Sequence, residues 1–282
     1  MDNAQVEPME NDLFPGFAEL ERVGWTSEMG ADGYIKAFSS ASDMTIPGIL
    51  NKLNGSSRVL DLCCGHGNVT AALLREGHTV IGVDFSPVMI ARARETAHQA
   101  EFMTADAQDL PFDDRDFDAV VCNFGISHVP NQPRALAEVG RLVKSGGVFV
   151  MTSWVGPSES PAFRIFYSGV QQYGDPSVKL PDGPNFHFFD DRDAAERELR
   201  AAGLSMSDHE RIGCFWDIDQ PDDLADIFEF GAPRGGALMR RQPDDARRAI
   251  RNSIAGKVRE TCQHTNGYRV PIPATLITAK AV

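Results

Sequence analysis

Two short apolar segments that each carry an acidic residue near their end constrain the fold of this chain most. Residues 59–70 read Val-Leu-Asp-Leu-Cys-Cys-Gly-His-Gly-Asn-Val-Thr, a strand followed by a turn of small residues and the start of a helix. A second strand, at residues 79–84, ends in Asp84. The carboxyl ends of parallel strands meet at one edge of a sheet, where small residues admit a ligand and a carboxylate accepts from two ribose hydroxyls. This pairing predicts a nucleotide-type cofactor at the edge of a parallel sheet.

The order of the glycines distinguishes two kinds of cofactor. A dinucleotide fold requires Gly-x-Gly-x-x-Gly, with a helix N-terminus that faces a pyrophosphate. Here Gly65 and Gly67 are followed by Thr70 at the position of the third glycine. Asp61, just before the turn, would repel a pyrophosphate but suits an ammonium group. The pattern therefore favours a cofactor with a positive charge over NAD.

The hydrophobic pattern between residues 58 and 154 alternates between strand and helix. Such alternation is typical of a parallel, doubly wound sheet with helices on both faces. The predicted fold class is therefore α/β, with a Rossmann-like, cofactor-binding core at 58–154. The pattern predicts strands at 58–62, 79–84, 101–105, 117–124 and 148–154, helices at 68–75, 87–97 and 133–143, and a turn at 144–147.

Four further parts flank this core. Residues 1–12 are expected to be a disordered tail, and residues 13–57 a helical cap. Residues 155–189 contain seven aromatic residues and five prolines, which discourage a regular element, and are expected to form a lid over an acceptor. Residues 190–282 are expected to complete the sheet around inserted helices. Their pattern predicts a helix at 190–202, a strand at 207–218, helices at 222–230 and 243–261, and a last strand at 273–280.

Composition restricts the partners and the compartment. The net charge of −13 argues against nucleic acid, because phosphates bind clustered Lys and Arg. No apolar run is long enough to span a bilayer, and the N-terminus lacks the pattern of a signal peptide. The five cysteines include no Cys-x-x-Cys pair of the kind that binds zinc. We therefore expect a cytoplasmic protein with reduced thiols, no metal, and no nucleic-acid or membrane partner.

The motif at residues 61–67 resembles the Asp-x-Gly-x-Gly-x-Gly motif of class I S-adenosylmethionine-dependent methyltransferases, with Cys63 at the position of the first glycine. The likeness spans residues 14–282 and is strongest over 58–154, where the chain is similar to small-molecule methyltransferases of ubiquinone and menaquinone biosynthesis. It implies a seven-stranded sheet whose last strand is antiparallel, S-adenosylmethionine as cofactor, and S-adenosylhomocysteine as product. The other segments that carry the likeness are 104–112, 117–124, 127–130, 135–139 and 141–147.

The resemblance also implies which residues contact the cofactor. Asp61 would accept, directly or through water, from the methionine ammonium, although a carboxylate that caps the following helix would have the same sequence signature. Asp84 would accept from two ribose hydroxyls, and Asp106 from the adenine amino group. The other predicted cofactor contacts are Tyr34, Cys63, Gly65, Gly67, Phe85, Met89, Ala107, Asn123 and Phe124.

Two histidines are candidates for a general base. His128 follows the fourth strand of the core, near the expected methyl group, and His187 lies within the aromatic insertion. A purely structural role is the alternative for each, because methyl transfer from a sulfonium has a neutral leaving group and needs little acid–base help. The acceptor is expected to be small and partly apolar. Its predicted contacts are Trp25, Phe163, Phe166, Tyr167 and Phe186.

Three functions are compatible with these features. The leading one is methyl transfer to O, N or C of a small acceptor. The second is a protein that binds the cofactor but catalyses another reaction, such as a cyclisation, and the third is a non-catalytic binding protein. The aromatic insertion also has two interpretations, because an acceptor pocket and a homodimer interface use the same residue types.

Overall fold

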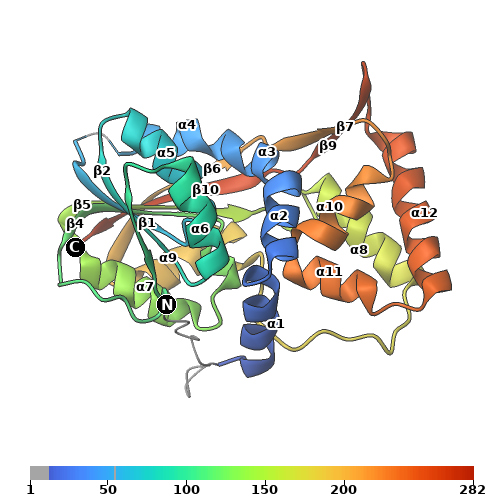
Figure 1. The fold of residues 1–282 in the computed structure, drawn as a ribbon, viewed down its shortest axis with the longest axis horizontal. Helices are drawn as coiled ribbons and strands as arrows, with labels where there is room; N and C mark the ends of the chain where they lie inside the picture. Colours follow the sequence, from blue (N-terminus) through green and yellow to red (C-terminus); the bar gives the residue numbers. More distant parts are fainter. Residues whose placement is uncertain (1–12, 54) are drawn as a thin grey trace.

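The computed structural model describes residues 13–53 and 55–282, so the disordered tail expected at residues 1–12 lies outside the described residues. Seven strands form one sheet in the order β3-β2-β1-β4-β5-β10-β6 (Figure 1). β10 is antiparallel to both of its neighbours. The expected α/β fold with an antiparallel last strand is therefore confirmed. The strands are β1 (Arg58–Leu62), β2 (Thr79–Asp84), β3 (Glu101–Thr104), β4 (Phe117–Asn123), β5 (Val143–Trp154), β6 (Leu204–Ile212) and β10 (Ala274–Ala281).

Helices cover both faces of this sheet because its central strands are apolar on both sides. Val59 of β1 belongs to a buried cluster with residues of α4 and α5, whereas Leu60 belongs to another with residues of α7 and α9. Each fully buried Val or Leu stabilises the fold by about 1.5–3 kcal/mol. This two-sided packing holds the carboxyl ends of the strands in place. The covering helices are α4 (Ile46–Asn51), α5 (Asn68–Arg75), α6 (Pro87–Thr96), α7 (Gln132–Leu142) and α9 (Arg192–Ala201).

A second part of the molecule, which we call the helical lobe, lies beside the sheet (right in Figure 1). It contains four helices and a small sheet of order β7-β9-β8. Most of it is the segment 213–273, which leaves the large sheet at Ile212 and returns at Ala274. These two residues are register partners in neighbouring strands. The elements of the lobe are α8 (Pro161–Tyr173), α10 (Asp223–Gly231), α11 (Pro233–Arg240), α12 (Asp244–Thr261), β7 (Phe215–Ile218), β8 (Gln263–His264) and β9 (Gly267–Pro271).

Three local predictions are wrong. The strand expected at 207–218 is two strands, since β6 ends at Ile212 and β7 begins at Phe215 in the other sheet. The insertion at 155–189 contains a regular element, α8, because its first residue, Pro161, sits in the first turn, where a missing N–H is tolerated. The turn expected at 144–147 is part of β5. In addition, α11, β8 and β9 were not predicted.

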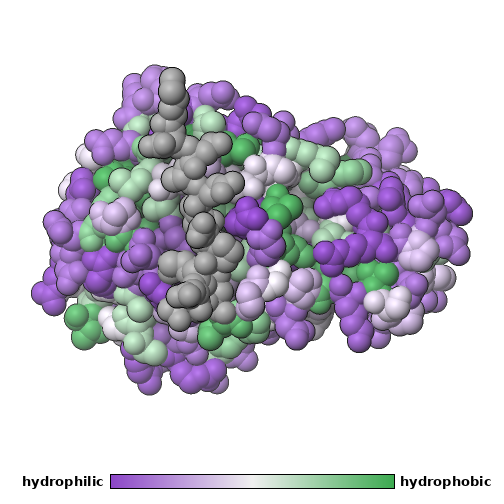
Figure 2. Space-filling view, turned by 60° about the horizontal axis from the view of Figure 1, so that its bottom comes forward, coloured by the Kyte–Doolittle hydropathy of each residue, from purple (hydrophilic) through white to green (hydrophobic). Residues whose placement is uncertain are grey.

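The N-terminal cap consists of α1 (Pro15–Trp25), α2 (Glu28–Ala37) and α3 (Ser39–Ser42) and leads into α4. α1 and α2 stand between the large sheet and the helical lobe (Figure 1). With the lower side of that view turned forward, hydrophobic residues show in the middle of the molecule, between two mostly hydrophilic halves (Figure 2). Within residues 13–53 and 55–282, no helix has the length and apolar character needed to cross a membrane.

Candidate active site

A cavity of about 680 Å³ lies where the carboxyl ends of β1, β2 and β4 meet the N-terminal cap and the helical lobe. Its size is typical of a small-molecule site. Most of the residues predicted to bind the cofactor or the acceptor line it, although they come from distant parts of the chain. Those residues are Trp25, Tyr34, Cys63, Gly65, Asp84, Phe85, Met89, Asp106, Ala107, Asn123, Phe124, His128, Phe163, Phe166, Tyr167 and Phe186. Asp61, Gly67 and His187 are not part of the lining.

The turn after β1 brings bare backbone to the cavity wall. Gly65 has φ +54°, and a Cβ built on it would meet open space, so the absence of a side chain leaves room for a ligand. Cys63 also has a positive φ, +56°, a conformation that glycine adopts more readily. A hydrogen bond to Cys122 and burial raise the pKa of the Cys63 thiol, so this residue is an uncharged wall. Gly67, at φ +81°, is instead the N-cap residue of α5 and packs against Ala93 of α6.

Asp84 presents a fixed carboxylate at the end of β2. Its Oδ2 accepts from the Gly65 backbone N–H at 2.9 Å, and its Oδ1 accepts from the Ser86 N–H at 2.9 Å. The side chain is 8% exposed, and burial raises its pKa. Each carboxylate oxygen can accept a second hydrogen bond. The arrangement therefore fits a vicinal diol, such as a ribose, placed against this edge of the cavity.

Asp61 lies beneath the turn rather than on the cavity wall. It is 1% exposed, and its Oδ2 accepts from the Thr70 hydroxyl at 2.5 Å in the first turn of α5. Burial raises the pKa of this carboxyl from 3.8 to about 7, although the bonds to Thr70 oppose the shift. The structure thus gives Asp61 the contacts of a helix cap. A bond to a cofactor ammonium remains a proposal.

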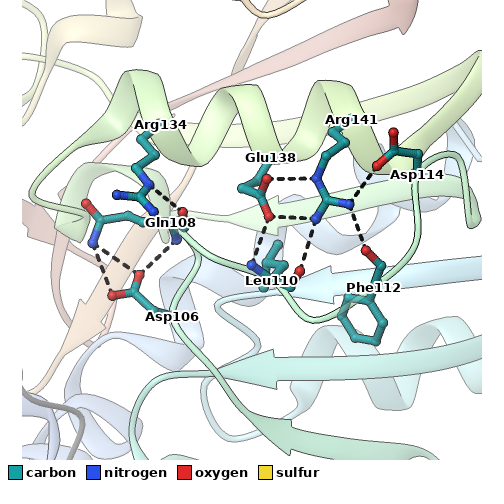
Figure 3. Close-up of polar contacts among 8 residues, drawn as sticks. All are labelled: Asp106, Gln108, Leu110, Phe112, Asp114, Arg134, Glu138 and Arg141. Carbon is teal, nitrogen blue, oxygen red and sulfur yellow. Dashed lines mark hydrogen bonds and ion pairs between the residues drawn. The ribbon is translucent and has the colours of Figure 1, made fainter. Parts of the chain in front are cut away.

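The loop after β3 carries Asp106 and is held from behind by α7 (Figure 3). Asp106 accepts from the backbone N–H of Gln108 at 2.8 Å, and Arg134 donates to the Gln108 carbonyl at 2.8 Å. Further along the loop, Glu138 accepts from the Leu110 N–H at 2.8 Å. Arg141 donates to the Leu110 carbonyl at 3.0 Å and also binds Glu138, whose pKa it lowers. These bonds fix the loop that presents Asp106 to the cavity.

We expect Arg141→Ala to loosen this loop without unfolding the protein. The arginine bonds the carbonyls of Leu110 and Phe112 and the carboxylates of Glu138 and Asp114, so its loss removes all of these charge-assisted bonds at a partly exposed site. Exchange of the Leu110 amide should become about tenfold faster, which corresponds to roughly 1.4 kcal/mol. Hydrogen-exchange mass spectrometry measures this directly. Arg200→Ala, on the exposed side of α9, is the matched control, and equal exchange in both variants would contradict the role of Arg141.

The end of β4 forms the floor of the cavity. The side-chain oxygen of Asn123 accepts from the hydroxyls of Thr45 at 2.9 Å and Thr152 at 2.6 Å, so protein groups already occupy it. Phe124 has φ +62° and stacks on Trp154 at 3.8 Å between ring centroids. Backbone atoms rather than the Asn123 side chain are therefore the groups that this floor offers to a ligand.

Aromatic rings enclose the rest of the cavity. Trp25 and Tyr34 of the cap meet edge to face at 5.1 Å, and burial raises the pKa of Tyr34 to about 12. In the helical lobe, Phe166 stacks on Phe228 with 4.2 Å between ring centroids and is 1% exposed. It therefore belongs to the hydrophobic core as well as to the cavity wall. Phe163 and Tyr167 stack on each other at 6.0 Å on α8. This wall suits a flat, apolar ligand.

The two candidate bases occupy different environments. His128 lines the cavity, and its Nδ1 lies 2.8 Å from Oε2 of Glu21, a buried residue of α1. His187 lies behind the lining, where its Nδ1 is 3.0 Å from the Trp154 carbonyl and its ring contacts Phe163. Burial lowers the pKa of His187. His128 is therefore the candidate with access to a ligand, whereas His187 supports the wall.

Sequence patterns alone missed several residues of the cavity. Glu21 had a detectable signal, since it lies on the helix face that also carries Phe17 and Trp25, where an acidic residue is out of place. Phe228 of α10 and Arg234 of α11 had no such signal, because nothing in the neighbouring sequence shows that they turn toward the cap. The missed lining residues include Glu21, Phe38, Gln108, Trp154, Phe228 and Arg234. Among residues 13–53 and 55–282, no group of three or more His, Cys, Asp or Glu is placed to hold a metal ion.

Comparison with known proteins places this site in a family. Residues 59–147 match the methyltransferase domain family. The demethylmenaquinone methyltransferase of Staphylococcus saprophyticus is 36% identical over 127 residues, which cover 42% of this chain and 54% of that protein. The enzyme of the same name from Clavibacter sepedonicus is 34% identical over 168 residues, 55% of this chain and 68% of that protein. For most of the curated relatives that it matches, the chain spans about half of their length.

The fold agrees with this assignment. The crystal structure of the YcgJ protein from Bacillus subtilis superposes with a TM-score of 0.57 at 21% identity, over 85% of this chain and 98% of that one. At this identity the likeness concerns the fold alone. Together with the sequence match over two thirds of the Clavibacter protein, it shows that this chain belongs to the class I S-adenosylmethionine-dependent methyltransferases.

Proposed function

We propose that this protein transfers the methyl group of S-adenosylmethionine to O, N or C of a small, partly apolar acceptor in the cytoplasm. The observation that carries the proposal is one continuous cavity. It joins the glycine turn, Asp84 and Asp106 on one side to an aromatic wall on the other. A cofactor and an acceptor can therefore meet inside a single cavity.

The cofactor side of the cavity fits S-adenosylmethionine. Asp84 would hold the ribose hydroxyls, and Asp106, with the Ala107 backbone, the adenine. Phe85 and Met89 pack near Trp25 and would lie against the base. When bound, the cofactor supplies an electrophilic methyl group on a sulfonium. The protein binds it, orients it and excludes water, which are the main sources of rate for this kind of transfer.

The aromatic rings that line the other side of the cavity support the proposal that an acceptor binds there. Trp25, Phe163, Tyr167 and Phe186 would hold the acceptor, with Phe166 as a fixed backing. His128 would serve as general base. Because these rings line a cavity inside one chain, their arrangement supports the pocket interpretation of the insertion over a homodimer interface.

We expect S-adenosylhomocysteine to bind and NAD not to bind. Thr70 stands where the dinucleotide motif has its third glycine, and Asp61 lies just before the turn, where a pyrophosphate would approach it. A thermal-shift assay of the full chain with each compound compares them. Stabilisation by NAD alone would overturn the cofactor assignment.

Product analysis separates methyl transfer from its alternatives. Incubation with S-adenosylmethionine and a panel of phenols, amines and activated-methylene compounds should release S-adenosylhomocysteine in step with methylated product. A cyclase would convert its substrate and leave the cofactor intact. A binding protein would bind the cofactor and convert nothing.

A further inference from the structure

Glu21 is an acidic residue on the buried face of α1, where it is 2% exposed. It shares that face with Phe17 and Trp25, which are four residues before and after it. Its Oε2 accepts from the Trp25 indole N–H at 2.8 Å and lies 2.8 Å from His128 Nδ1. Its Oε1 is buried and has no hydrogen-bond partner.

A buried carboxylate with hydrogen bonds to only one of its oxygens destabilises the fold at such a position. Desolvation of the charge opposes folding, and only one of the two oxygens recovers hydrogen bonds. Between Phe17 and Trp25, a leucine or methionine would pack the same face without that cost. A buried acid that destabilises the fold and bonds an ionisable side chain at a cavity is typical of a functional site.

We propose that Glu21 is a positioning residue for His128, and that this pair makes the protein specific for acceptors that lose a proton. The inference rests on the methyl-transfer function proposed above. A carboxylate accepts hydrogen bonds, so the Nδ1 that faces Glu21 carries the ring proton. The other nitrogen, Nε2, then has a free lone pair with which to accept a proton from a ligand.

The surroundings of His128 hold its ring in this orientation. Trp25 contacts the ring edge to face at 5.1 Å, and Phe186 does so at 5.0 Å from the insertion. Two acidic groups face the ring, Glu21 from α1 and Asp84 from the end of β2.

The acceptor class follows from this proton balance. A lone pair of the acceptor atom forms the bond to the methyl carbon, and the carbon–sulfur bond breaks with its electrons left on sulfur. The proton of the acceptor passes to His128 Nε2. A weakly acidic O–H or an N–H group meets this description, whereas a tertiary amine or a thioether has no proton to give.

The position of Glu21 also couples the base to the N-terminal cap. α1 lies outside the residues that match the methyltransferase domain family, 59–147. His128 lies inside them, at the end of the short helix that follows β4. The base is therefore oriented only when the cap is docked on the core, which is also when Trp25 closes the cavity wall.

The ring tautomer tests the pair without knowledge of the acceptor. The full chain, labelled with nitrogen-15 in histidine and saturated with S-adenosylhomocysteine, is observed by NMR, and the His128 signals are those missing in His128→Gln. We expect the neutral ring to carry its proton on Nδ1, and Glu21→Met to shift it toward Nε2. A wild-type ring protonated on Nε2, or an unchanged tautomer in Glu21→Met, would overturn the inference. Glu21→Leu serves if the methionine variant does not fold.

Kinetics with an O–H or N–H acceptor from the product screen give the second test. Glu21→Met should lower kcat by roughly 10²-fold, with S-adenosylhomocysteine affinity within about threefold of wild type. Thermal unfolding should show that the variant stays folded, although the Trp25 indole N–H loses its acceptor. Glu28→Met, at an exposed acid of the neighbouring cap helix α2 that does not line the cavity, is the matched control. A parallel loss of cofactor affinity and kcat would assign Glu21 a structural role.

Failure of the proposed function remains distinguishable from failure of this inference. If the wild-type chain does not bind S-adenosylhomocysteine, the methyltransferase proposal fails, whereas the tautomer of the free protein still reports on the Glu21–His128 pair. If the cofactor binds and the methyl is transferred at equal rates by Glu21→Met, only the inference fails.

Discussion

Replacing Asp84 with alanine should weaken S-adenosylhomocysteine binding by roughly 2 to 4 kcal/mol, about 30- to 900-fold in Kd, because two charge-assisted hydrogen bonds to the ribose are lost. The carboxylate is held in place by the backbone N–H groups of Gly65 and Ser86, so it needs no reorganisation to accept from a ligand. Isothermal titration calorimetry of the full chain measures the change.

Two further variants make this result interpretable. Asp84→Asn keeps one acceptor oxygen for the turn and should lose less affinity than Asp84→Ala. Asp182→Ala removes an exposed acid that also lines the cavity and should bind as the wild type does. Thermal unfolding without ligand checks that each variant is folded. An unchanged Kd for Asp84→Ala would mean that the ribose lies elsewhere.

Asp61→Asn should stabilise the protein increasingly as pH rises. The pKa of Asp61 is about 7 when folded, against 3.8 in the reference state, and burial is the main cause. Because the pKa is higher in the folded state, the contribution of Asp61 to the unfolding free energy is fully present below about pH 4. It is lost as the pH rises through 7. The unfolding free energy of Asp61→Asn relative to wild type should therefore grow by about 3 kcal/mol between pH 5 and pH 8.

Urea unfolding at several pH values provides this comparison. Asparagine keeps an oxygen that accepts from the Thr70 hydroxyl, so the difference isolates the charge. Thr70→Val is the complementary variant: it removes a bond that lowers the pKa of Asp61, so it should lower stability more at pH 8 than at pH 5. A stability difference between Asp61→Asn and wild type that does not vary with pH would show that Asp61 has an ordinary pKa. If Asp61 binds the cofactor ammonium, the same variant should bind S-adenosylmethionine more weakly, so stability and binding would change in opposite directions.

Sequence patterns predicted the sheet well because its strands are buried on both faces. Short, mostly apolar segments such as Phe117–Asn123 have few other stable structures. The same reasoning located Asp84, since strand ends meet at one edge in any parallel sheet, whereas Asp106 was predicted from the family resemblance of segment 104–112. His128 was predicted for a related reason, because it follows β4 closely.

The helical lobe was less predictable because long-range contacts decide its structure. Residues 207–218 have strand character throughout, and only Gly213 marks the point where the chain changes sheets. Which sheet each half joins depends on the pairing of Ile212 with Ala274, far along the sequence. Similarly, His187 shows no local sign that it points behind the wall, because the Trp154 carbonyl that it contacts belongs to another element.

Segment 213–273 leaves the large sheet and returns to it at neighbouring positions. This arrangement affects which parts of the protein can be replaced. Because Ile212 and Ala274 are neighbours across two strands, whatever joins them need only span a short, fixed gap. The entropy of closing such a loop depends weakly on its length, so longer, shorter or differently folded segments can take its place. The residues at 155–190 are joined in a similar way, since the Gly156 N–H donates to Asp190. Evolution or an engineer can thus exchange the walls that we propose to contact the acceptor while the cofactor half stays intact, and chimaeras are best cut at these two junctions.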